Sequence, residues 1–143
     1  MSETQIAHGH CLCGRVGITA GRMSRHLVAC HCGMCRKWGG GPFMAVSCGT
    51  DVTFSGEAYI STFRSSEWAE RGFCRTCGTH LFYRRVGTGH YEIPVGLFDD
   101  ADIASFTLQI FTERQPDYYA FANRTRLMTE EEVLALCAPS EGQ

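Results

Sequence analysis

The chain has 143 residues, of which 44% are hydrophobic and 20% charged, and its formal net charge is -2. This composition is typical of a globular protein and excludes a disordered chain. The slightly acidic balance argues against nucleic acid as the main partner, because phosphate contacts need a basic surface. No apolar run approaches 18 residues, so we expect no membrane span. The length predicts one domain, residues 1–143.

The predicted elements are mostly short strands separated by glycine. In chain order we predict strands at residues 4–10, 15–20, 26–30, 43–48, 51–55, 58–64, 67–73, 79–85, 90–98 and 105–112. Their length and spacing indicate a mainly β fold of antiparallel sheets, packed as a sandwich or open barrel. Near the end, Thr129-Glu130-Glu131-Glu132 forms a capping box and predicts a short C-terminal helix.

Seven of the nine cysteines fall into three tight clusters. They are a CxC at Cys11 and Cys13, a CxCxxC at Cys30, Cys32 and Cys35, and a CxxC at Cys74 and Cys77. Thiols this close together suit tetrahedral zinc. The N-terminus has no basic segment followed by an apolar run, so we expect no signal peptide and a cytoplasmic protein with reduced thiols. The cysteines are therefore interpreted as metal ligands.

The seven thiols divide most simply into four and three. Cys30, Cys32 and Cys35 are local enough to surround one metal ion. Cys11, Cys13, Cys74 and Cys77 then make a structural zinc site that staples the N-terminal strands to the hairpin formed by residues 67–73 and 79–85. A competing partition pairs the CxxC with two cysteines of the CxCxxC. The first partition is preferred because it leaves none of the seven thiols unexplained.

A zinc ion held by three cysteines keeps one open position, as a catalytic zinc requires. Three thiolates make its formal charge -1, so this metal favours a soft thiolate over water as fourth ligand. Arg36 and Lys37 either offset that negative charge or form a solvated surface pair. The alternative is a second structural zinc with His31 or a distant residue as fourth ligand. His31 is expected to point away and make an ordinary hydrogen bond.

The three cysteine motifs, in this order, resemble the glutathione-dependent formaldehyde-activating enzyme family, which includes the centromere protein V relatives. The matching strings are Cys11-Leu12-Cys13-Gly14, Cys30-His31-Cys32-x-x-Cys35-Arg36-Lys37 and Phe73-Cys74-x-x-Cys77-Gly78-Thr79-x-Leu81-Phe82, with a later Val95-Gly96-x-x-Asp99-Asp100. The resemblance covers roughly residues 8–125. It implies a β-tent zinc fold with two zinc ions. Cys11, Cys13, Cys74 and Cys77 match the structural site, and Cys30, Cys32 and Cys35 match the catalytic site.

The activity that the resemblance implies joins glutathione to formaldehyde and is classed as a carbon–sulfur lyase. We therefore expect an enzyme whose partners are a small-molecule thiol and a small aldehyde, with no nucleic acid and no membrane. Two alternatives stay open. One is a non-catalytic zinc scaffold or interaction module. The other is a redox enzyme similar to methionine sulfoxide reductase B, which would need a reactive cysteine among the two outside the clusters, Cys48 and Cys137.

Overall fold

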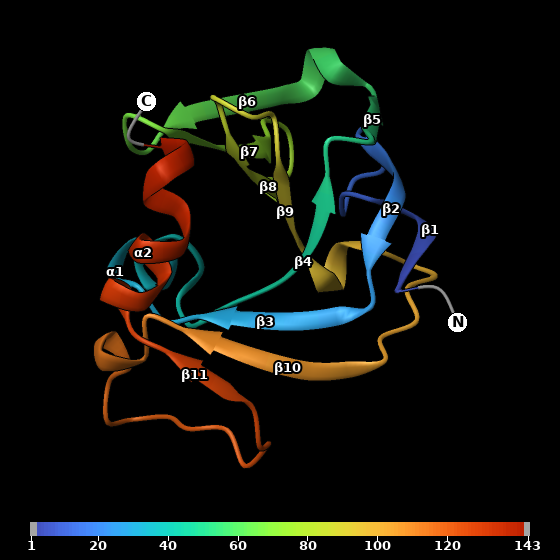
Figure 1. The fold of residues 1–143 in the computed structure, drawn as a ribbon. Coiled ribbons are helices and arrows are strands. Elements are labelled where there is room, and N and C mark those ends of the chain that lie inside the picture. Colours follow the sequence, from blue (N-terminus) through green and yellow to red (C-terminus); the bar gives the residue numbers. More distant parts are fainter. Residues whose placement is uncertain (1–2, 142–143) are drawn as a thin grey trace.

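The computed structural model describes residues 3–141, and strands dominate it (Figure 1). The strands are β1 (Thr4–His10), β2 (Gly17–Ser24), β3 (His26–Cys30), β4 (Phe43–Gly49), β5 (Val52–Ser55), β6 (Ile60–Arg64), β7 (Ala69–Cys74), β8 (His80–Arg85), β9 (Tyr91–Pro94), β10 (Ser105–Ile110) and β11 (Arg126–Met128). The α-helices are α1 (Gly33–Gly39) and α2 (Glu130–Glu141), and short 3-10 turns occupy Glu57–Tyr59, Val95–Leu97 and Thr112–Arg114. Within residues 3–141, neither helix has the length and apolar character needed to cross a membrane.

The strands form two open sheets. The smaller has the order β1-β2-β5, and the larger has the order β11-β10-β3-β4-β9-β8-β7-β6. The predicted mainly β fold with a short C-terminal helix is confirmed. The expectation of antiparallel pairing holds for most pairs, but β10 runs parallel to both β3 and β11. Parallel strands need a long connection, and most of the larger sheet lies between β3 and β10 in the chain.

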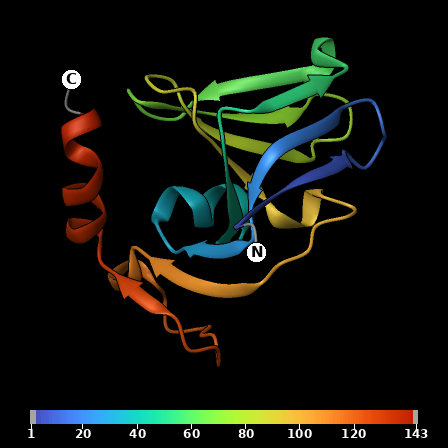
Figure 2. The ribbon, with the colours of Figure 1, turned by 45° about the vertical axis from the view of Figure 1, so that its right-hand side comes forward.

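The larger sheet bends, so that its two halves face each other. In Figure 1, β3 and β10 run along the bottom, β6 runs along the top, and β4 and β9 connect the two levels. The helix α2 stands at the side between these levels, and Figure 2 shows the same arrangement after rotation. This bend leaves one face of the sheet concave and partly covered by α2.

The smaller sheet packs against the larger one through the apolar core. Fully buried members of this core include Val16, Met23, Val46, Leu81 and Ile93. Gly9 of β1 forms an isolated bridge to Phe98 after β9. A Cβ atom on Gly9 would clash with the carbonyl oxygen of Leu97, so only glycine allows the two backbones to approach this closely.

Candidate active site

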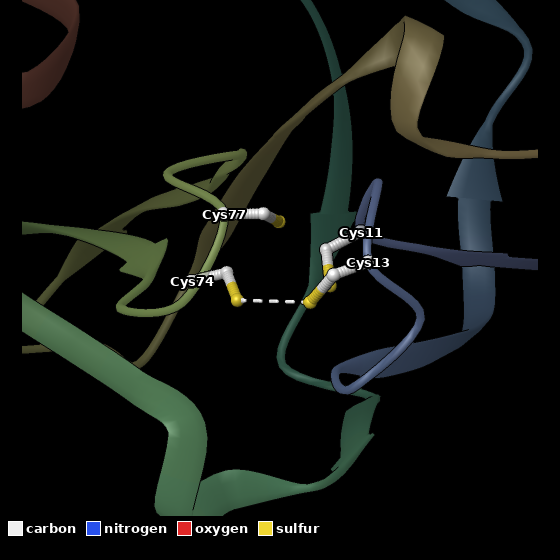
Figure 3. Close-up of side chains that lie close together, drawn as sticks. All are labelled: Cys11, Cys13, Cys74 and Cys77. Carbon is white, nitrogen blue, oxygen red and sulfur yellow. Dashed lines mark hydrogen bonds between the residues drawn. The ribbon is translucent and has the colours of Figure 1, made fainter.

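Two tight turns bring the first group of thiols together (Figure 3). Cys11 and Cys13 lie between β1 and β2, where the Gly14 N–H donates to the Cys11 carbonyl oxygen at 3.0 Å. Cys74 ends β7, and the Gly78 N–H donates to the Cys74 carbonyl oxygen at 2.7 Å. Gly14 and Gly78 have φ of 81° and 78°, a conformation that glycine adopts without steric penalty. The glycine after each cysteine pair therefore closes each turn.

The geometry of this group fits a metal ion. The sulfur atoms of Cys11, Cys13, Cys74 and Cys77 all lie within 4.8 Å of one another. Cys13 Sγ is 3.6 Å from Cys11 Sγ and 3.8 Å from Cys74 Sγ, and Figure 3 marks the second contact with a dashed line. A tetrahedron of sulfurs at zinc-thiolate distance has edges of about 3.8 Å. These four thiols can therefore hold a metal ion.

Thr79 ties the two turns of the four-thiol group together. Its hydroxyl accepts a hydrogen bond from the Leu12 N–H at 3.0 Å and lies 3.2 Å from Cys77 Sγ. Hydrogen bonds from the side chain and backbone of Thr79 lower the pKa of the Cys77 thiol to about 5. Thiolates are the form that binds metal, so Thr79 prepares this thiol as a ligand.

A second group of thiols forms where β3 meets α1. The sulfur atoms of Cys30, Cys32 and Cys35 also lie within 4.8 Å of one another. Cys30 ends β3, Cys32 caps α1, and Cys35 lies in its first turn. The Cys32 sulfur accepts a hydrogen bond from the Cys35 N–H at 3.3 Å. Hydrogen bonds from the other two thiols lower the pKa of Cys32, and the charge of Arg71 lowers it further. This group can also hold a metal ion.

The cation beside these thiols is Arg71 of β7. Its Nη1 and Nη2 atoms lie 3.8 and 3.7 Å from Cys35 Sγ. The guanidinium is buried and lies over the rings of Trp38 and Tyr83, at 5.0 and 5.2 Å. Sequence reasoning missed this residue and pointed to Arg36 and Lys37. Arg36 Nε instead donates to the carbonyl oxygen of His31 at 3.0 Å.

His31 faces away from the three thiols that surround it in sequence. It is fully buried, with Nδ1 2.7 Å from the Tyr119 hydroxyl and Nε2 2.8 Å from Gln109 Oε1. Both ring nitrogens therefore already have hydrogen-bond partners. This arrangement bears out the expected ordinary hydrogen bonding and gives no support to His31 as a fourth ligand.

A cavity of about 720 Å³ opens next to the three-thiol group. Cys30, Cys32 and Cys35 line it, whereas none of the four thiols of the other group does. Its wall is largely apolar and comes from β3, α1, β4, β10 with the residue after it, and α2, through Val28, Met34, Phe43, Ala45, Leu108, Ile110, Phe111, Val133 and Leu134. Its polar lining includes Arg71, Ser47, Tyr83 and Glu92. The volume is that of a small-molecule pocket.

Sequence reasoning also missed Glu92 on the wall of this cavity. Burial raises the pKa of its carboxyl to about 7. The signal was present in the sequence, as a charged residue between Tyr91 and Ile93 in an otherwise apolar strand.

Of the two cysteines outside the thiol groups, Cys48 is fully buried, and burial raises the pKa of its thiol to about 12. Such a thiol is inert, which counts against the redox alternative. The side chain of Cys137 lies outside the part of the chain that is described.

Fold and site together define a mainly β protein with two thiol groups suited to metal ions, one of them on a small-molecule cavity. The model of the glutathione-dependent formaldehyde-activating enzyme family matches residues 6–114, and the chain belongs to this family. An uncharacterized lyase of Schizosaccharomyces pombe is 37% identical over 127 residues, which cover 88% of this chain and 93% of the relative. A crystal structure of a Rhodobacter sphaeroides protein has a similar fold, with a TM-score of 0.56 and 24% identity, over 64% of this chain and 87% of that one.

Proposed function

We propose that this protein is a zinc-dependent carbon–sulfur lyase that joins a thiol to a small aldehyde and also catalyses the reverse cleavage. Glutathione and formaldehyde are the proposed substrates, because the family is described by them. The observation that supports this proposal most strongly is that the group of Cys30, Cys32 and Cys35 lines the large cavity, whereas the four-thiol group does not. Formaldehyde alone would fill little of that volume, so the thiol substrate would occupy most of it.

The proposal assigns one zinc ion to each thiol group. Cys11, Cys13, Cys74 and Cys77 would hold a structural ion, and Cys30, Cys32 and Cys35 would hold the catalytic one. A zinc ion with three thiolates supplies a position that favours a soft sulfur ligand. The sulfur spacing in both groups supports this assignment. The location proposed is the cytoplasm, because none of the eight described cysteines forms a disulfide.

The residues around the three-thiol group would bind and orient the substrates. Arg71 places a buried positive charge against Cys35 Sγ, which stabilises negative charge gathered on the sulfurs. The apolar wall excludes water from the reacting atoms and holds them close together, which favours addition over separate diffusion.

The direct test measures exchange between glutathione, formaldehyde and their adduct by nuclear magnetic resonance. We expect the protein to accelerate exchange, Cys32→Ser to abolish the acceleration, and Cys48→Ala, the matched change outside both groups, to retain it. Acceleration retained by Cys32→Ser would contradict the site assignment. If the wild-type protein accelerates exchange for no thiol and aldehyde, the scaffold alternative replaces the proposal.

A further inference from the structure

One row of side chains crosses the floor of the cavity. The strand register places Ser47 of β4 opposite Glu92 of β9. Glu92 is in turn opposite Tyr83 of β8, and Tyr83 is opposite Arg71 of β7. All four residues line the cavity. Neighbouring strands are about 4.8 Å apart, so the backbones of Glu92 and Arg71 are separated by roughly 10 Å. Since Arg71 contacts Cys35 Sγ, the row joins a carboxyl group to the thiol group.

Polar partners hold Glu92 in this row. Ser47 donates a hydrogen bond to its carboxyl. His90 Nε2 lies 2.7 Å from Ser47 Oγ and 3.5 Å from Glu92 Oε2. The Glu92 side chain is 27% exposed and that of His90 38%. These contacts form a short polar chain from a partly exposed histidine to a carboxyl group in the cavity wall.

We propose that Glu92 is the proton-transfer residue of this cavity: it takes the proton of the thiol substrate and gives it to the aldehyde oxygen. This inference rests on the proposed function. The thiol S–H proton passes to the Glu92 carboxylate, and a sulfur electron pair forms the new S–C bond. The π pair of the carbonyl moves to oxygen, which then receives the proton from the Glu92 carboxyl. The cleavage reaction is the reverse, and neither direction needs an oxidant or a further reactant.

The other ionisable groups around Glu92 are less suited to this role. Those facing it are Cys48 from β4, Tyr83 and Arg85 from β8, and His90 before β9, with Arg71, Arg114 and Glu130 elsewhere on the cavity wall. The Cys48 thiol has a pKa of about 12. The Glu130 carboxylate is already paired with Arg114 at 2.8 Å. Glu92, with a pKa of about 7, can both accept and donate a proton near neutral pH.

The test compares Glu92→Gln with Glu70→Gln. Glu70 is the matched control because its side chain is 25% exposed, it lies next to Arg71 on the opposite face of β7, and it pairs with Arg84. We expect Glu92→Gln to lower kcat by about 100-fold or more, in line with losses of general acid–base groups. Thiol binding, measured by calorimetry, should change less than about threefold, because the amide keeps the size of the carboxyl. Glu70→Gln should leave both quantities unchanged.

The pH profile adds a readout that a purely structural role would not produce. The wild-type kcat for addition should rise as pH rises through about 7, because the carboxyl must be ionised to take the proton of the thiol. Glu92→Gln should lack this step, while Glu92→Asp should keep it at a reduced rate. Wild-type activity in Glu92→Gln, or loss of thiol binding along with activity, would overturn this inference alone. A wild-type protein without any lyase activity would overturn the proposed function and this inference with it.

Discussion

Single residues set the charge balance of the three-thiol group. Three thiolates around one divalent cation would carry a formal charge of -1. Such a charge is costly among buried groups unless a partner offsets it. Arg71 supplies that partner from β7, held between the rings of Trp38 and Tyr83. It lies 36 positions beyond Cys35 in the chain, so local sequence could not indicate it and offered only the neighbouring cations Arg36 and Lys37, either as offsetting charges or as a solvated surface pair.

The two thiol groups should respond differently to the loss of one sulfur. Cys74 is fully buried and joins β7 to the turn before β2, so Cys74→Ser should lower Tm by roughly 10 °C or prevent folding. Cys32→Ser should remove about one equivalent of zinc while Tm stays within roughly 5 °C, because its group lies within one short stretch of chain. Thermal unfolding with elemental analysis measures both. Equal destabilisation would indicate two structural sites.

Glu92 should lower stability above neutral pH. Burial raises the pKa of its carboxyl from 4.5 to about 7, so the unfolded chain loses this proton at a lower pH than the folded one. The free energy of unfolding therefore falls as pH rises from about 4.5 to 7 and stays reduced above it. Glu92→Gln should raise stability by roughly 1–3 kcal/mol at pH 8 and change it little at pH 4. Urea unfolding at both pH values tests this, and an equal effect at the two would contradict it.

At the scale of elements, local patterns predicted the strands better than their pairing. The expected strands at residues 4–10 and 26–30 match β1 and β3. The helix α1 was missed because Gly39-Gly40-Gly41 resembles a loop, and its cap is a cysteine, Cys32, whose sulfur accepts the capping hydrogen bond. The parallel pairing of β3 with β10 depends on contacts distant in sequence, which strand propensity does not encode.

In the site, too, local sequence patterns predicted some features, whereas features formed by residues distant in sequence were not predicted. The partition of the clustered cysteines that the sequence analysis preferred matches the two thiol groups that the structure brings together. The cavity beside Cys30 was not predictable, because its wall comes from six strands and both helices. Arg71 and Glu92 reach it only through the register of β7, β8 and β9. Their roles follow from tertiary structure.

The helix α2 should control access to the cavity. Its predicted capping box is present, because Glu132 N–H donates to Thr129 Oγ1 at 3.2 Å and Thr129 N–H donates to Glu132 Oε1 at 2.8 Å. Val133 and Leu134 of this helix line the cavity. Thr129→Ala should weaken α2 by about 1 kcal/mol. We expect faster amide exchange in α2 and a raised KM with kcat nearly unchanged.

The control for this prediction is Thr62→Ala, which replaces an exposed residue of the edge strand β6. It should leave both the amide exchange of α2 and the KM at wild-type values. A Thr129→Ala variant with unchanged KM would show that α2 does not control access of the substrate to the cavity.

At the scale of the whole molecule, the two thiol groups hold different parts of the fold. The four-thiol group joins the turn of the smaller sheet to the hairpin of the larger sheet. The three-thiol group joins β3 only to the helix that follows it directly. Loss of the first would release contacts between two sheets, whereas loss of the second would affect a local turn at the cavity.

This difference predicts two separate stages when a chelator removes zinc. Three protein ligands hold an ion less well than four, and the three-thiol group faces the cavity. The first equivalent released should therefore abolish lyase activity while the circular dichroism spectrum is unchanged. The second equivalent should leave together with unfolding, because structural zinc contributes directly to the folding free energy. Zinc release, activity and circular dichroism recorded on one sample test this order. Simultaneous release of both ions, or unfolding before activity is lost, would contradict the assignment of one structural and one catalytic ion.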